Sequence, residues 1–179
     1  MSVWDEVTGQ PRAVAALRRA AAASRPGADD RQAFTNSWLI TGPPGSGRST
    51  AAYAFAAALL CPEGGCGECP SCAQVAARTH PDLTAVVTET TLLDIATARG
   101  LVERASLAPV SADHRVIVVE DADRMVARTS NTLLKAIEEP ALTTVKVEKL
   151  ELGRLGATRL LDLLAGVDPQ PRTVLPTAL

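Results

Sequence analysis

Four cysteines crowd into one short segment and form the clearest chemical signal in the chain. They are Cys61, Cys66, Cys69 and Cys72, and the sequence contains no others. Thiolates at such close spacing can surround a zinc ion as a tetrahedron, and a site with four protein ligands is structural rather than catalytic. We therefore expect a structural zinc module at residues 61–72. The alternative is a group of surface thiols that binds no metal.

A glycine-rich loop lies between a predicted buried strand and a predicted helix. In such a loop the backbone N–H groups turn inward around phosphate oxygens, and the helix N-terminus adds partial positive charge. Ser49 is placed to put its hydroxyl on a magnesium ion. The candidate nucleotide-binding residues are Gly42, Pro43, Pro44, Gly45, Ser46, Gly47, Arg48, Ser49 and Thr50.

One position departs from the usual pattern of this loop, because Arg48 stands where lysine is expected. The guanidinium is broader and planar, so it cannot occupy the pocket of a lysine ammonium unchanged. We therefore expect this loop to be a poor site for ATP and Mg²⁺, with slow hydrolysis of the nucleotide. A loop with a purely structural role is the alternative.

A second acidic motif follows farther along the chain, where the apolar strand 115–119 ends at Glu120 and Asp121. In phosphate-transferring enzymes the first acid helps to hold magnesium and the next activates water. An active enzyme would show Asp before Glu, and Asp121 is one methylene too short to reach water well. We treat both as degenerate catalytic candidates and expect this strand to lie beside the strand of the loop. Alternatively, the two acids only solvate a strand end.

These groups require a framework of alternating strands and helices. Helices are predicted at 12–24, 48–60, 92–107 and 131–139, and strands at 37–41, 83–87 and 115–119. The alternation predicts an α/β fold in which helices cover both faces of a parallel sheet, a three-layer arrangement. Beyond Pro140 a strand at 143–147, a helix at 150–165 and a strand at 172–175 are predicted.

Composition and charge limit the partners and the cellular compartment that we expect for the protein. The net charge of −2 leaves no basic footprint, so contact with nucleic acid must be local or made by partners. The N-terminus lacks an apolar signal region, and no apolar run reaches the roughly 18 residues of a membrane helix. We therefore expect a cytoplasmic protein without a membrane contact, where clustered cysteines favour metal over disulfides. His80 is predicted to be a turn residue and His114 a plain surface residue.

Several motifs, taken in order, resemble one known family. They are residues 3–10, the loop 42–49, the four-cysteine segment, His80-Pro-Asp, residues 118–125 and residues 130–140. Over residues 1–141 the chain resembles the delta prime subunits of bacterial DNA polymerase III, which are AAA+ clamp-loader proteins of the P-loop NTPase class. The tau/gamma subunits share most of these motifs but would keep the loop lysine and the Asp-Glu order. Arg48 and the Glu120–Asp121 pair therefore favour delta prime.

The resemblance implies a scaffold role in DNA replication. Such subunits join tau/gamma and delta in a loader that places the sliding clamp on primed DNA, driven by ATP in neighbouring subunits. The chain would then be a component of DNA polymerase III and not a working ATPase. The family's Ser-Arg-Cys motif, sensor strand, lid and collar are missing, which implies a truncated AAA+ domain. An active ATPase of the tau/gamma type and a non-functional truncated chimera remain alternatives.

The segment 142–179 does not follow that family. It resembles the C-terminal strand, helix and strand of LacI-type transcription repressors, joined near Ala141 and Leu142. No helix-turn-helix accompanies it, so the resemblance implies no repressor function. We expect the strand at 143–147 to be able to fill a slot at the edge of the sheet.

Overall fold

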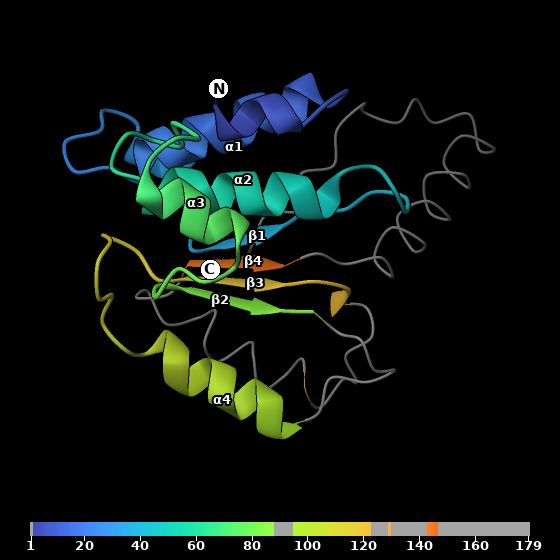
Figure 1. Ribbon diagram of the computed structural model, residues 1–179, viewed down its shortest axis with the longest axis vertical. Coiled ribbons are helices and arrows are strands. Elements are labelled where there is room, and N and C mark those ends of the chain that lie inside the picture. The colour runs from blue at the N-terminus through green and yellow to red at the C-terminus, as the bar shows by residue number, and fades with distance from the viewer. Residues whose placement is uncertain (1, 88–94, 123–128, 130–142, 147–179) are drawn as a thin grey trace.

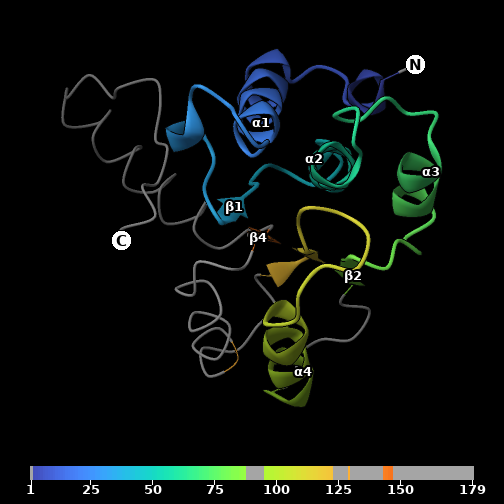
Figure 2. The ribbon, with the colours of Figure 1, turned by 90° about the vertical axis from the view of Figure 1, so that its left-hand side faces the viewer.

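One small parallel sheet, with helices on both faces, organises the part of the chain that the computed structural model describes (Figures 1 and 2). The described residues are 2–87, 95–122, 129 and 143–146. The helices are α1 (Pro11–Ala23), α2 (Arg48–Leu60), α3 (Pro70–Ala76) and α4 (Ile95–Ala105), with short 3-10 helices η1 (Val3–Glu6) and η2 (Arg31–Ala33). The strands are β1 (Ser37–Leu39), β2 (Leu83–Val86), β3 (Val116–Val119) and β4 (Thr143–Lys146). Among the described helices, none has the length and apolar composition needed to cross a membrane.

Strand β3 shows why both faces of the sheet are covered. Its four residues are all buried and alternate between two apolar clusters. Val116 and Val118 face the cluster formed with α1 and α2, whereas Ile117 and Val119 face the cluster formed with α4. Because successive side chains of a strand point to opposite faces, a strand buried on both sides must be apolar throughout. This confirms the predicted parallel sheet between two layers of helices.

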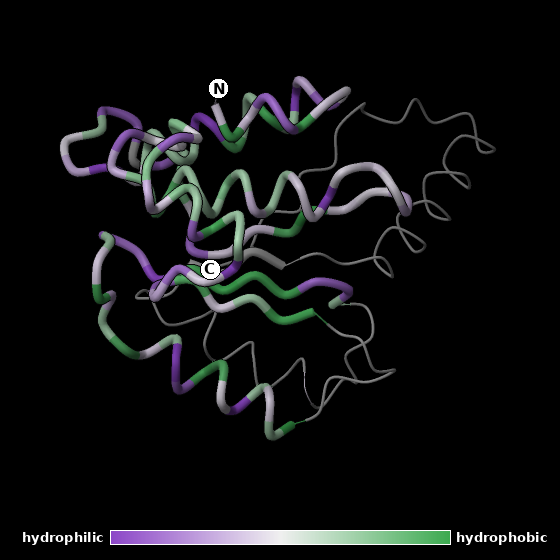
Figure 3. The backbone as a smooth tube through the Cα atoms, viewed as in Figure 1, coloured by the Kyte–Doolittle hydropathy of each residue, from purple (hydrophilic) through white to green (hydrophobic). Residues whose placement is uncertain are grey.

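Helix α2 is the central helix of the molecule. It begins after Gly47, whose positive φ of 80° suits glycine, and the Ala51 N–H donates to the Gly47 carbonyl at 2.9 Å. Its alanine-rich sequence lets neighbouring elements approach closely, and it packs against α1, α3, η1 and β3. Figure 3 shows apolar residues along α2 and β3. A helix that is apolar on most sides belongs in the interior, and its bounds confirm the prediction at 48–60.

The position of β4 corrects two expectations. The sheet order is β1-β4-β3-β2. Val145 of β4 pairs with Trp38 of β1 on one side and with Val118 of β3 on the other. The strand predicted at 143–147 therefore lies inside the sheet and not at its edge. It also separates β1 from β3, so the loop strand and the acid-tipped strand are not adjacent. Chain order does not determine spatial order here, because parallel strands are joined by crossovers that can skip a position.

The structure contains a helix that was not predicted. Helix α3 was not predicted, although Pro70 at its first position is a recognised start signal. Helix α4 falls inside the predicted span 92–107. The predicted helices at 131–139 and 150–165 and the predicted strand at 172–175 lie outside the described residues.

The buried carboxylate of Asp82 fixes the loop that leads into β3. It accepts hydrogen bonds from the backbone N–H groups of Val110, Ser111 and Ala112 at 2.6, 2.8 and 3.0 Å and from the Ser111 hydroxyl at 2.9 Å. The Arg115 guanidinium lies 3.6 Å away. Burial opposes ionisation, but these donors hold the pKa of Asp82 below its usual value.

The two histidines have different roles. His80 lies in the turn before β2, as predicted, and its Nδ1 accepts the Asp82 N–H at 3.1 Å. Burial lowers the pKa of His80, which favours the neutral ring that this hydrogen bond requires. His114 is not a plain surface residue, because it is half-buried and its ring centroid lies 5.4 Å from that of Phe34.

Replacing Asp82 with Asn should weaken the fold, because an amide cannot accept all of these hydrogen bonds. We expect Asp82→Asn to lower the free energy of unfolding by about 2–3 kcal/mol at pH 7, measured by denaturant titration. Because the folded pKa is lowered, this stabilisation is present above the unfolded pKa of about 4 and is lost as pH falls further. The exposed Asp113→Asn is the matched control in the same loop. Equal stability of the two variants would contradict this role for Asp82.

Candidate functional site

The predicted phosphate loop adopts the tight turns that its sequence suggested. Residues 40–47 connect β1 to α2, and Gly45 within them has a positive φ of 79°. A Cβ at Gly42 would lie 2.5 Å from the Ser46 hydroxyl, so a side chain there would collide with the loop. The Ser46 N–H donates to the Pro43 carbonyl at 3.1 Å. Nucleotide binding by residues 42–50 stays a prediction.

The end of this loop and the acidic strand end meet, although β4 lies between their strands. Ser49, in the first turn of α2, donates its hydroxyl hydrogen to Glu120 Oε2 at 2.5 Å. The Glu120 N–H in turn donates to the Val86 carbonyl at 2.9 Å, which ties the end of β3 to β2. The structure therefore brings together the two motifs that the sequence marked as parts of one site.

Two residues that the sequence analysis missed also contact Glu120. The Tyr53 hydroxyl donates to Glu120 Oε1 at 2.9 Å, and Arg78 Nη2 lies 3.4 Å from the same oxygen. The Arg78 guanidinium carbon also lies 4.6 Å from the centroid of the Tyr53 ring. Tyr53 stands one helical turn after Ser49, a spacing that would have placed both on one face. No local signal points to Arg78, because its contact depends on where α3 ends.

This arrangement satisfies the carboxylate from within the protein. Only 14% of the Glu120 side chain is exposed. Burial, the hydrogen bond to Glu120 and its negative charge raise the pKa of Tyr53, so the phenol stays protonated as a donor. Asp121 follows with a positive φ of 50°, a left-handed conformation that is uncommon outside glycine. A catalytic role for either acid stays a prediction.

The arginine that replaces lysine in the loop folds back toward the start of the loop. A Cβ at Gly42 would lie 3.5 Å from Arg48 Cγ. Arg48 Nη1 is buried and has no hydrogen-bond partner among the described residues. A buried donor without a partner costs free energy, and an anion in the loop could remove that cost.

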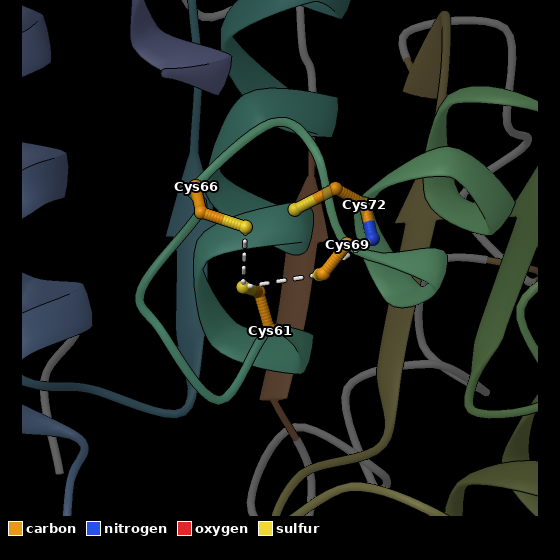
Figure 4. A group of neighbouring side chains, drawn as sticks. All are labelled: Cys61, Cys66, Cys69 and Cys72. Atoms are coloured by element: carbon orange, nitrogen blue, oxygen red, sulfur yellow. Dashed lines mark hydrogen bonds between the residues drawn. The ribbon is translucent and has the colours of Figure 1, made fainter. Parts of the chain in front are cut away.

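The four cysteines gather as the spacing predicted (Figure 4). Their sulfur atoms all lie within 4.8 Å of one another. Cys61 Sγ lies 3.8 Å from Cys66 Sγ and 3.5 Å from Cys69 Sγ, and none of the four forms a disulfide. Four sulfur atoms at these distances can bind a metal ion.

Backbone donors point at the sulfur atoms of this cluster. The Glu63 N–H donates to Cys61 Sγ at 3.3 Å. The Gly67 N–H donates to Cys72 Sγ at 3.4 Å, and the Cys72 N–H donates to Cys69 Sγ at 3.4 Å. Burial opposes the thiolate at Cys61, but nearby backbone donors lower its pKa to about 6. Burial raises the pKa of Cys72. Backbone donors of this kind favour the thiolate form at Cys61.

The N-terminal segment anchors the cysteine segment. Arg25 donates to the carbonyls of Pro62 and Cys61 at 2.6 and 2.9 Å, and the Val3 N–H donates to the Gly65 carbonyl at 3.1 Å. A Cβ at Gly65 would lie 2.5 Å from Val3 Cγ2, so this contact requires glycine. Arg25 therefore has a local structural role.

Comparisons with known proteins agree on one group. The sequence matches the protein family described as DNA polymerase III, delta subunit, over residues 10–147. DNA polymerase III subunit delta' of Bacillus subtilis is 30% identical over 121 residues, covering 66% of this chain and 37% of that protein. The delta' subunit of Pseudomonas aeruginosa is 35% identical over 121 residues, covering 64% and 37%. Subunit gamma/tau of Mycobacterium tuberculosis is 32% identical over 147 residues, covering 76% and 23%. The chain thus spans little more than a third of the delta' relatives.

The surroundings of Glu120 predict a spectroscopic change. Because Tyr53 is the single tyrosine, its ionisation can be followed directly by tyrosinate absorbance. We expect no ionisation in the unmodified protein near pH 10, the usual range for tyrosine, and ionisation at a lower pH in Glu120→Gln. Circular dichroism at each pH verifies that the fold persists. An unchanged titration in Glu120→Gln would show that Glu120 does not control the phenol.

Proposed function

Because the chain belongs to the DNA polymerase III delta subunit family, we propose that it is a scaffold component of a bacterial clamp loader. In this role it would act in the cytoplasm with tau/gamma and delta subunits, helping to place the sliding clamp on primed DNA. Its net charge of −2 fits contact with DNA through the complex. The family match over residues 10–147 carries this proposal.

We place the domain in the AAA+ class of P-loop NTPases. The glycine-rich loop follows β1, the acid follows β3, and helices cover both faces of the parallel sheet. Backbone amides at the start of α2 suit phosphate oxygens, and a phosphate could give Arg48 Nη1 the acceptor that it lacks. Residues 42–50 are therefore the proposed nucleotide-binding segment.

The surroundings of Glu120 argue against a working ATPase. Magnesium at a phosphate site needs carboxylate and hydroxyl oxygens that are available to it. Here Ser49, Tyr53 and Arg78 already engage the Glu120 carboxylate, so the residues present do not fit that ion. Arg48 in place of lysine points the same way. We propose that ATP is hydrolysed by neighbouring subunits.

We propose that the cysteine cluster binds one structural zinc ion. Zinc–sulfur bonds of about 2.3 Å imply sulfur separations of about 3.8 Å in a tetrahedron. The separations of 3.8 and 3.5 Å at Cys61 fit this value, and backbone donors to the sulfurs would stabilise the thiolates. Bound zinc would add its binding free energy to the folding of residues 61–72.

Two alternatives rest on specific observations. The similarity to subunit gamma/tau of Mycobacterium tuberculosis supports the first alternative, an active ATPase of the tau/gamma type. The resemblance of the tail to LacI-type repressors supports the second alternative, a non-functional truncated chimera. In that case the chain would divide into two units, residues 1–141 and residues 142–179. The family match extends to residue 147, and β4 pairs within the sheet, so residues 143–146 support a longer first unit.

Assembly and turnover separate these three functions. We expect the 179-residue chain to co-elute with tau/gamma and delta subunits from its source organism in size-exclusion chromatography. The chain alone should show no magnesium-dependent ATP turnover above a protein-free blank. Steady turnover by the chain alone would favour the tau/gamma alternative. Failure to join the other subunits would favour the chimera.

Metal content tests the zinc proposal separately. Native mass spectrometry should show one zinc per chain, and Cys66→Ser should bind zinc markedly more weakly because one of four thiolates is lost. Ser71→Ala lies in the same segment and is the matched control, since its hydroxyl donates to the Leu60 carbonyl and not to sulfur. Carefully purified protein without zinc, and without affinity for added zinc, would refute the proposal.

A further inference from the structure

Arg78 lies at the point where helix α3 ends and where Glu120 faces α2. We propose that its guanidinium is the resident cation of the Glu120 site, in the place that a divalent metal ion takes beside such an acid. The site would then exclude magnesium while Arg78 is in place and would accept a divalent ion once Arg78 is removed. This inference depends on the contacts of Glu120 and not on the proposed role in clamp loading.

The contacts of Glu120 leave little room for a metal. One carboxylate oxygen accepts from Ser49 at 2.5 Å, and the other accepts from Tyr53 at 2.9 Å and lies 3.4 Å from Arg78. A magnesium ion binds oxygen at about 2.1 Å in a near-ideal octahedron. It would have to displace hydroxyl donors and also enter beside a guanidinium of like charge.

The Tyr53 ring holds the Arg78 side chain over this site. Its guanidinium carbon lies 4.6 Å from the Tyr53 ring centroid, a favourable distance for a cation over an aromatic face. Tyr53 therefore contacts Arg78 with its ring and Glu120 with its hydroxyl. The cation, the phenol and the carboxylate are therefore in mutual contact.

The backbone conformation of Arg78 is unusual for a residue with a side chain. The residue has a positive φ of 59° and ends α3 in a Schellman motif. Its N–H donates to the Val75 carbonyl at 3.0 Å, and the Thr79 N–H donates to the Gln74 carbonyl at 2.8 Å. Glycine is the usual residue at this position, because a side chain is disfavoured in the left-handed region. An arginine here accepts that cost while its side chain neutralises Glu120.

The same feature provides a clean variant. Arg78→Gly removes the cation and relieves the left-handed backbone, so the helix cap should be retained or strengthened. Because 48% of the Arg78 side chain is exposed, its removal opens no buried cavity. Arg78→Lys keeps a positive charge at the same position and is the matched control.

Paramagnetic broadening by Mn²⁺ is the test, with the full chain first loaded with one zinc per chain to occupy the cysteines and then freed of excess Zn²⁺. Isotope-labelled tyrosine gives one ring signal, because Tyr53 is the single tyrosine. In Arg78→Gly we expect this signal to broaden at a Mn²⁺ concentration roughly tenfold lower than in the unmodified protein, from the loss of like-charge repulsion. Arg78→Lys should behave like the unmodified protein, and adding Glu120→Gln to Arg78→Gly should abolish the gain.

Two outcomes would overturn the inference. Broadening at the same Mn²⁺ concentration with and without Arg78 would show that the guanidinium does not keep the metal out. Arg78→Gly protein that folds normally but shows no broadening would show that Glu120 forms no latent metal site.

Discussion

Burial of α2 on most of its surface is the constraint on which the rest of the structure depends. The helix is packed by α1, α3, η1 and β3, and the many alanines in its sequence allow those elements to come close. Its two ends carry the two candidate sites, Ser49 at the start and Cys61 just after the last turn. A larger residue within α2 would therefore disturb the sheet, the loop and the cysteine cluster together.

Glu120 is a strand-end acid whose carboxylate is engaged by side chains from other elements. Its position after β3 and its contact with Ser49 resemble a metal-binding acid beside a phosphate loop. Tyr53 and Arg78 turn the same carboxylate into a bridge between β3, α2 and the end of α3. In the proposed scaffold role such a bridge would stabilise the domain, whereas an enzyme would need the carboxylate for its metal.

Helix α3 connects the two candidate sites physically. Cys69 caps its start, Cys72 lies in its first turn, and Arg78 follows its last turn. The helix is short and its Val75 is buried against the core, so the cysteine cluster and Arg78 lie at the two ends of one packed element. Anchoring by Arg25 and Val3 extends this network to the N-terminal segment.

The sequence alone was sufficient for α2 at 48–60, the turn role of His80 and the gathering of the four cysteines. These features depend on residues close in the chain, on glycine turns and on apolar spacing. Tertiary structure decided the place of β4 between β1 and β3, since a crossover can return to either side of a strand. It also decided that Arg78 reaches Glu120, because that contact joins segments brought together only by packing of α3 on α2, and no local pattern encodes it.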